Sequence, residues 1–166
     1  FANANNLFDP ESGISYHLSE NNILVLDKPE YRINGGEWNA PEYVLTLDDK
    51  LRQTIGANPR GGQMVQPWCN SSRRKTGEID LALRYTVNAD VIPDDGVEFA
   101  VERPDLYKVT FNGKEVDKTD TGWWCDLSLR KMRIPAELFV RGKNVLMLEC
   151  RYSNLLPGLE MAYITG

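Results

Sequence analysis

The feature that most constrains the fold is a two-residue alternation of apolar and polar side chains over residues 78–88. Side chains on a β-strand point alternately to opposite faces, so this pattern gives one buried and one solvated face. The stretch therefore predicts a half-buried strand. Its inward-facing members are Ile79, Leu81, Leu83, Tyr85 and Val87.

The same alternation recurs in the second half of the chain. It is found over residues 97–101, 107–111 and 146–152, and a final apolar run covers 159–164. Short strands at fairly regular spacing, with little helix between them, are typical of sandwiches and barrels. We therefore expect a mainly β protein, with a two-sheet antiparallel β-sandwich from about residue 77 onward. Its predicted core residues are Tyr85, Val109, Phe111, Leu146 and Leu148.

One α-helix is predicted in the N-terminal part, over about residues 40–55. Its apolar side chains recur at spacings of three and four, which places them on one face of the helix. We expect Asn39 to cap the helix, with Pro41 in the first turn and Gly56 at the stop. The apolar face consists of Val44, Leu47, Leu51 and Ile55.

Two Asn-Gly steps, at residues 34–35 and 112–113, predict tight hairpin turns, because both central positions of such a turn require positive φ. Residues 1–76 are interpreted as an N-terminal extension with short strands, the helix and a linker, and residues 77–166 as the β-sandwich. The chain lacks an initiator Met, and both of its ends look cut from a longer protein.

Charge and hydropathy exclude two classes of partner. The chain carries 19 Lys and Arg against 24 Asp and Glu, which gives a net charge of −5. Nucleic-acid binding needs a basic surface that neutralises phosphates, and a membrane span needs roughly 20 apolar residues in a row. We expect neither a nucleic acid nor a membrane as a partner. The localisation of the parent protein stays open, with a secreted or periplasmic one as the candidate.

The three cysteines are an odd number without metal-ligand spacing, so at least one thiol is free. Cys125 and Cys150 lie in strand-like sequence and are predicted to be small buried side chains. No cofactor is predicted, and a structural calcium ion is left open.

Two motifs of the predicted sandwich resemble a known family. Residues 106–116, LYKVTFNGKEV, are similar to the x-V-x-x-N-G-x-x-V hairpin of galactose-binding-like jelly rolls. Residues 134–146, IPAELFVRGKNVL, resemble the segment I-P-x-x-L-x-x-G-x-N-x-L of the same domains, with one residue more between Leu138 and Gly142. The loop 122–126 and the closing run 159–166 are also similar, the latter to domains of bacterial glycoside hydrolases, including rhamnosidase-like ones. The resemblance covers about residues 22–166. It implies that the sandwich is a jelly roll, and that this group of domains continues with another strand after Gly166, so the jelly roll is expected to be truncated at its C-terminus.

The resemblance implies a non-catalytic accessory module of a multidomain glycoside hydrolase. In that family the catalytic acids lie on a separate barrel domain, so no catalytic residue is carried over to this chain. We expect a sandwich that packs beside other domains of the parent chain and is a candidate for carbohydrate contact. An autonomous carbohydrate-binding module is the alternative, and an independent glycan-active enzyme is a remote one.

The candidate carbohydrate site consists of Trp123 and Trp124, with Asp120 and Asp126 as polar partners. An exposed indole offers a flat apolar face on which a sugar ring can stack, while nearby carboxylates hydrogen-bond its hydroxyl groups. Adjacent residues of a strand point to opposite faces, so one tryptophan is expected to enter the core. The alternative is that both pack, the second of them against a neighbouring domain.

Catalytic patterns are sparse in this sequence. His17 is the only histidine, and no Ser or Cys pattern accompanies it. A glycosidase needs two carboxylates about 5–10 Å apart, but acids such as Asp95, Glu98 and Glu102 would occur on any acidic surface. Because no pair is singled out, we expect the chain to have no catalytic activity of its own.

Overall fold

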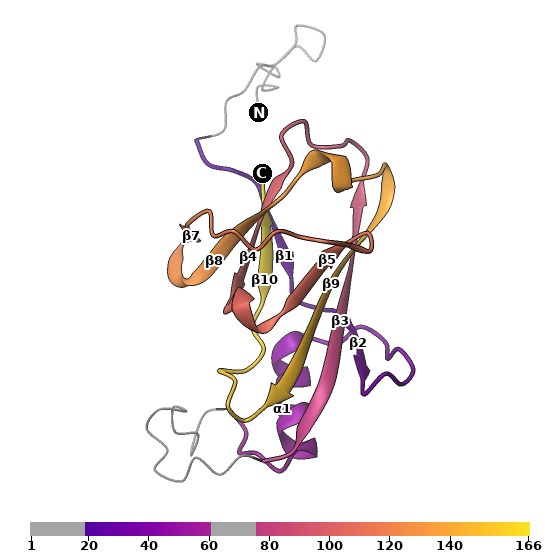
Figure 1. Ribbon diagram of the computed structural model, residues 1–166, viewed down its shortest axis with the longest axis vertical. Helices are drawn as coiled ribbons and strands as arrows, with labels where there is room; N and C mark the ends of the chain where they lie inside the picture. The colour runs from indigo at the N-terminus through magenta and orange to yellow at the C-terminus, as the bar shows by residue number, and fades with distance from the viewer. Residues whose placement is uncertain (1–18, 61–75) are drawn as a thin grey trace, which may run out of the picture.

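The computed structural model describes residues 19–60 and 76–166, which form two antiparallel β-sheets and one α-helix (Figure 1). Sheet A consists, in spatial order, of β1 (Ile23–Leu26), β10 (Ala162–Thr165), β4 (Val97–Glu102), β8 (Asp126–Ile134) and β7 (Trp123–Trp124). Sheet B consists of β2 (Glu30–Ile33), β3 (Glu78–Ala89), β9 (Gly142–Ser153), β5 (Lys108–Phe111) and β6 (Lys114–Glu115). The predicted antiparallel β-sandwich is confirmed.

The strand predicted from the alternation at residues 78–88 is β3, and it pairs with β9 along its whole length. Leu83 lies opposite Leu148, and Tyr85 lies opposite Leu146. All four side chains are buried, as are Val109 and Phe111 on β5. The predicted core residues are therefore confirmed, and they form the inner face of sheet B.

Sheet A supplies the other half of the core. Phe99 on β4 lies opposite Met132 on β8 and Ile164 on β10, and all three are buried. Burial of a side chain of this size contributes about 1.5–3 kcal/mol. Because faces alternate along a strand, the neighbours of Ile164 and Phe99, such as Tyr163, point away from sheet B. They define the outer face of sheet A.

The outer face of sheet B follows from the same alternation. Asp80, Ala82 and Arg84 alternate with the inward-facing side chains of β3, so they point away from the core. Arg32 on β2 and Glu149 on β9 are the register partners of Ala82, and so they share its face. Unlike the core face, this surface is rich in charged side chains.

The helix α1 (Val44–Thr54) begins later than predicted. Its cap residue is Tyr43, so the prediction that Asn39 caps the helix is wrong. Asn39 instead forms an isolated bridge with β2. The segment before the helix is extended rather than helical, because the backbone N–H groups of Asn39 and Glu42 donate to the carbonyls of Tyr31 and Pro29 at 2.8 and 3.1 Å. The chain therefore follows the start of β2 until the helix begins, and Pro41 lies before the first turn.

The apolar face and the end of α1 agree with the prediction. Val44, Leu47, Leu51 and Ile55 are buried in the same core as the strands. Gly56 follows with a φ of 71°, a left-handed conformation in which glycine commonly ends a helix. Figure 1 shows α1 beside the ends of β3 and β9.

Both Asn-Gly steps are turns with positive φ. The values are 49° and 70° at Asn34 and Gly35, and 50° and 78° at Asn112 and Gly113. The second turn joins β5 to β6 as predicted, with Phe111 opposite Lys114. A short 3-10 turn, η1 (Pro104–Leu106), precedes β5, and a second, η2 (Ala136–Leu138), precedes β9.

Two strands that precede residue 77 belong to the sandwich, since β1 lies in sheet A and β2 in sheet B. Several residues discussed from the sequence lie outside the described ranges. They are His17 and the third cysteine, Cys69.

Candidate functional site

The two tryptophans of the candidate site form β7, a two-residue strand at the edge of sheet A. Trp123 lies opposite Arg130 and Trp124 lies opposite Asp126, with an irregular register between them. Cys125 follows with a φ of 51°, so the chain reverses there and runs directly into β8. The sharp reversal holds β7 at the rim of the sandwich.

The two indole rings have different surroundings, and neither enters the core. Trp124 is half-buried and packs against Tyr163 on the outer face of sheet A, with ring centroids 4.6 Å apart. Trp123 keeps 52% of its surface exposed. The expectation that one tryptophan enters the core is therefore wrong, because β7 lies at the edge of sheet A and the ring of Trp124 packs on the outer face of that sheet.

Asp120 lies near Trp123 because both are neighbours of Arg130. Its carboxylate accepts hydrogen bonds from Nε of Arg130 at 2.9 Å and from the backbone N–H of Gly122 at 2.8 Å. The arginine is also the register partner of Trp123. The hydrogen bond from Arg130, assisted by the backbone N–H, holds the pKa of Asp120 below its ordinary value. This corner of the molecule thus presents an exposed indole beside a charged pair.

Asp126 lies apart from that pair, on the side of Trp124. Its Oδ1 accepts hydrogen bonds at 2.7 Å from the backbone N–H and from the hydroxyl of Ser128. These bonds, the backbone one first, lower the pKa of Asp126. The serine hydroxyl also lies 3.1 Å from Oε1 of Glu102. The structure therefore divides the four predicted residues into two pairs, Asp120 with Trp123 and Asp126 with Trp124.

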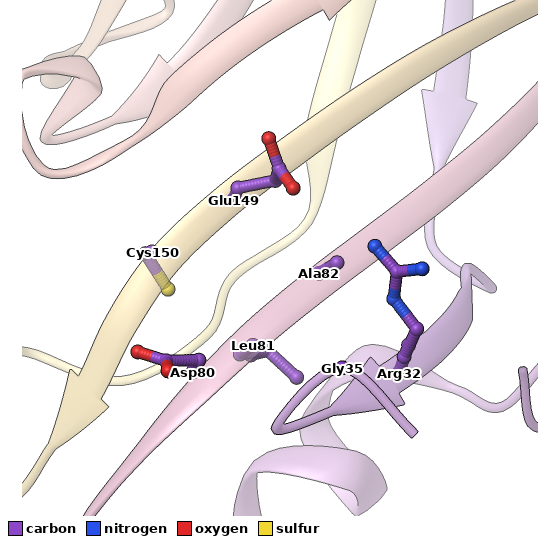
Figure 2. Close-up of a pocket in the computed structure, with 7 residues that line it drawn as sticks. All are labelled: Arg32, Gly35, Asp80, Leu81, Ala82, Glu149 and Cys150. Atoms are coloured by element: carbon purple, nitrogen blue, oxygen red, sulfur yellow. The ribbon is translucent and has the colours of Figure 1, made fainter. Parts of the chain in front are cut away.

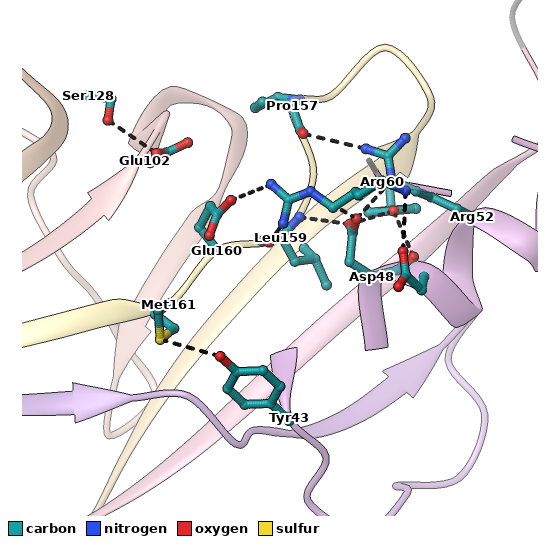
Figure 3. A network of polar contacts seen from close by, with 12 residues as sticks. Tyr43, Asp48, Arg52, Arg60, Glu102, Ser128, Pro157, Leu159, Glu160 and Met161 are labelled. Atoms are coloured by element: carbon teal, nitrogen blue, oxygen red, sulfur yellow. Dashed lines mark hydrogen bonds and ion pairs between the residues drawn. The ribbon is translucent and has the colours of Figure 1, made fainter. Parts of the chain in front are cut away.

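A charged cluster, formed by Asp48, Arg52, Arg60 and Tyr152, ties α1 to β9 and to the segment before β10. Figure 3 shows its two arginines beside Asp48. Asp48 is fully buried, and its Oδ2 pairs with Nε of Arg52 at 2.8 Å. Its Oδ1 accepts hydrogen bonds from the hydroxyl of Tyr152 at 2.6 Å and from the backbone N–H of Leu159 at 2.7 Å. With its oxygens satisfied in this way, Asp48 is a structural residue rather than a catalytic acid.

The same cluster reaches the surface through Arg60. Its Nη1 donates to the carbonyl of Leu159 at 2.8 Å, and its Nη2 pairs with Glu160. Figure 3 shows Glu160 leading towards Met161, whose sulfur lies 4.0 Å from the hydroxyl of Tyr43. The charged cluster therefore fixes the segment that feeds β10 into sheet A.

A buried amide cluster, formed by Asn112 and Asn144, explains the two motifs that carry the family resemblance. Oδ1 of Asn144 accepts from Nδ2 of Asn112 at 2.8 Å and from the backbone N–H of Val140 at 2.9 Å. Its Nδ2 donates to the carbonyls of Val140 and Gly142. Asn112 in turn accepts from the backbone N–H of Val145 at 2.9 Å. Both asparagines hold turns together, so these motifs report on the fold and not on a ligand.

A hollow on the outer face of sheet B was not predicted from the sequence (Figure 2). Its volume is about 440 Å³, and charged side chains from three strands surround it. The one sequence feature that points to the hollow is Ala82, a small residue among the polar, outward-facing side chains of β3. The lining residues are Arg32, Gly35, Asp80, Leu81, Ala82, Glu149 and Cys150.

The two cysteines of the described ranges differ from each other. Cys150 is half-buried beside the hollow, and burial raises the pKa of its thiol to about 12, so it stays protonated at neutral pH. Cys125 is exposed, so the prediction that it is a buried side chain is wrong. Its left-handed turn at the sheet edge leaves no layer to cover it.

Within residues 19–60 and 76–166, no three His, Cys, Asp or Glu side chains are grouped as a metal site would require. In the same ranges, no helix combines the length and the apolar character that a membrane crossing requires. Comparisons with protein-family models, with curated proteins and with solved structures found no match for this chain.

Proposed function

We propose that the chain is a non-catalytic β-sandwich module of a multidomain glycoside hydrolase, which packs beside another domain of the same protein and contacts glycan. The observation that carries the proposal is an apolar strip on the outer face of sheet A. It consists of Ile23, Val25, Tyr163 and Trp124. Val25 lies opposite Tyr163, and Tyr163 packs against Trp124, so the strip crosses the face from one edge strand to the other.

The strip begins on a strand that is unusually open to solvent. This strand, β1, lies at the edge of sheet A, and its residues Ile23, Leu24 and Val25 keep between 44% and 47% of their surface exposed. Soluble proteins usually protect such edges with charged residues, because an open apolar edge invites pairing with another chain. Contiguous exposed apolar surface is typical of a contact with another protein. A net charge of −5 on each copy opposes self-association, which favours a different domain as the partner.

Glycan contact is assigned to Trp123. The exposed indole can stack on the apolar face of a sugar ring, and Asp120 and Arg130 beside it can hydrogen-bond hydroxyl groups. One stacked ring leaves little net affinity after the entropy cost of association, so binding is expected to be weak. The same exposed tryptophan supports the second candidate, an autonomous carbohydrate-binding module.

The docking test mixes this chain with the other domains encoded by the same gene, each expressed separately, and measures complex formation by calorimetry and light scattering. The double variant Ile23→Asp/Val25→Asp is expected to lose the complex, because it places two charges in the strip. The matched control is Val91→Asp, since Val91 is 73% exposed in the loop between β3 and β4. Circular dichroism checks that each variant is folded.

Two results would contradict the proposal. One is the absence of a complex with every domain of the parent protein, or the formation of a homodimer through the strip instead. The other is turnover of chromogenic glycosides by this chain, abolished by changing one of its carboxylates.

A further inference from the structure

The hollow on the outer face of sheet B arises from a single cross-strand row. Arg32, Ala82, Glu149 and Lys108 stand side by side on β2, β3, β9 and β5. Ala82 is by far the smallest of the four, and Figure 2 shows it between Arg32 and Glu149. The methyl group is the floor, and the long side chains beside it are the walls. The volume of about 440 Å³ lies within the range of about 300–1,000 Å³ that is usual for small-molecule sites.

The wall formed by Arg32 is held in place without an ion pair. Its guanidinium stacks over the ring of Trp38 at 4.8 Å, and no carboxylate of the described ranges pairs with it. Arg84 stacks on the same ring at 4.0 Å, but it is paired with Glu30 at 2.8 Å. Stacking engages the face of a guanidinium and leaves its N–H edge available. Arg32 is therefore an ordered cation whose donors are free for an acid.

The opposite wall supplies hydrogen-bond acceptors. Oε2 of Glu149 lies 3.9 Å from Nζ of Lys108, a loose pair that leaves the carboxylate able to accept hydrogen bonds. Asp80 lies 3.3 Å from Arg151, which offsets its charge. Carboxylates in such positions accept hydrogen bonds from hydroxyl groups, as in many carbohydrate sites. The hollow thus joins an unpaired cation on one side to acceptors on the other.

We propose that this hollow binds a saccharide that carries a carboxylate, that is, a uronic-acid residue. The sugar carboxylate pairs with the N–H edge of Arg32 in a bidentate geometry. The ring hydroxyls donate to Glu149 and Asp80, and the sugar ring lies over Ala82. The choice of saccharides as the ligand class rests on the proposed function, whereas the requirement for a carboxylate rests on the hollow alone.

The distribution of charge selects a uronate over other anions. Phosphate or sulfate would present acceptor oxygens in every direction and would face the carboxylates of Glu149 and Asp80. A uronate places its negative charge at one end of the ring and hydroxyl donors at the other. A neutral sugar would leave the donors of Arg32 without an acid.

The test titrates the whole chain with trigalacturonate, with its methyl ester, and with oligomers of glucuronate and mannuronate, followed by calorimetry and by amide and arginine NMR signals. At least one free acid is expected to bind at millimolar concentration or below and to shift the signals of Arg32 and Ala82. Esterification is expected to weaken binding at least about tenfold, because it removes a charge-assisted pair.

Two variants separate the parts of the site. Arg32→Ala is expected to weaken binding at least about tenfold, to the level of the methyl ester. Ala82→Leu fills the hollow and is expected to abolish binding. Thr86→Leu is the matched control for the second variant, because Thr86 is exposed on the same face of β3 and does not line the hollow. Arg141→Ala, in an exposed loop, is the control for the first.

The proposal is overturned if no uronate oligomer binds at 10 mM, on the order of the weakest affinity that such a site would need to be useful. It is also overturned if the methyl ester binds as well as the acid, or if Ala82→Leu leaves binding unchanged. Loss of domain docking with intact uronate binding would remove the proposed function and leave this site. Signal shifts at Trp123 instead of Arg32 would place saccharide binding at the rim of sheet A.

Discussion

The amide cluster and the charged cluster sit at opposite ends of β9, and they solve the same problem in different ways. Asn144, near the start of the strand, satisfies its buried polar atoms with a second amide and with backbone groups. Tyr152, near the end of the strand, donates to a buried aspartate that is paired with an arginine. The neutral cluster closes local turns. The charged one joins a helix, a strand and a loop that are distant in sequence.

The difference between the two clusters predicts where the stability of the fold depends on single residues. Removal of one partner from a buried ion pair leaves an uncompensated charge, whereas removal of an amide leaves only unpaired dipoles. The charged cluster should therefore be the more sensitive of the two, and its loss should affect the whole sandwich.

The largest effect is expected for Asp48→Ala. The change leaves the guanidinium of Arg52, which is 3% exposed, without its partner, and it removes the acceptor for Leu159. We expect a loss of about 3–5 kcal/mol in the free energy of unfolding, measured by urea denaturation. Asp94→Ala, at an exposed position, is the control and should change stability by less than about 0.5 kcal/mol. A loss below about 1 kcal/mol for Asp48→Ala would erase the contrast between the clusters.

A smaller loss, about 2–3 kcal/mol, is expected for Asn144→Ala, because the backbone groups of Val140 and Gly142 and the amide of Asn112 lose hydrogen bonds to this fully buried side chain. Asn88→Ala removes an exposed amide from β3 and serves as the control. The same urea titrations measure both. If Asn144→Ala proved as costly as Asp48→Ala, charge would not be what distinguishes the two ends of β9.

The smallest effect is expected for Tyr152→Phe, at about 1 kcal/mol. The variant keeps the buried ring and removes one hydrogen bond to Asp48, which retains Arg52 and the backbone of Leu159 as partners. Thermal and urea unfolding of this variant therefore measure how much one neutral hydrogen-bond donor of the charged cluster contributes to the free energy of unfolding. A loss close to that of Asp48→Ala would show that the hydroxyl, and not the ion pair, carries the cluster.

The same contrast explains what could be predicted from the sequence. The sequence marked both positions of the amide cluster, because Asn112 lies in an Asn-Gly turn and Asn144 in a motif that resembles a known family, but the hydrogen bond between the two amides was not predicted. Strands and core residues were predictable for a related reason, since periodicity is a local property. The charged cluster was not predictable, because Asp48 meets partners more than a hundred residues away.

The candidate site shows the same limit. The sequence could place Trp123 near Asp120, but it could not show that the two tryptophans lie at a sheet edge, outside the core. The cap of α1 was misplaced because Asn39 and Glu42 are hydrogen-bonded to the backbone of Tyr31 and Pro29, contacts that a helix pattern does not report. The hollow beside Arg32 depends on the register of β2, β3 and β9, and register between distant strands is a tertiary property.

The pairing of β3 with β9 also bears on how fast the chain acquires its structure. The twelve paired positions join residues that are 53 to 75 apart along the chain, from Ala89 with Gly142 to Glu78 with Ser153. A loop of that length must close before any of these pairs can form, and closure carries an entropy cost that no early contact offsets. Chains dominated by such distant pairings acquire their structure in about milliseconds to seconds, whereas helical bundles need only microseconds to milliseconds. Newly synthesised copies therefore expose the apolar faces of both sheets for that time. During this interval the chain can either aggregate or be bound by chaperones.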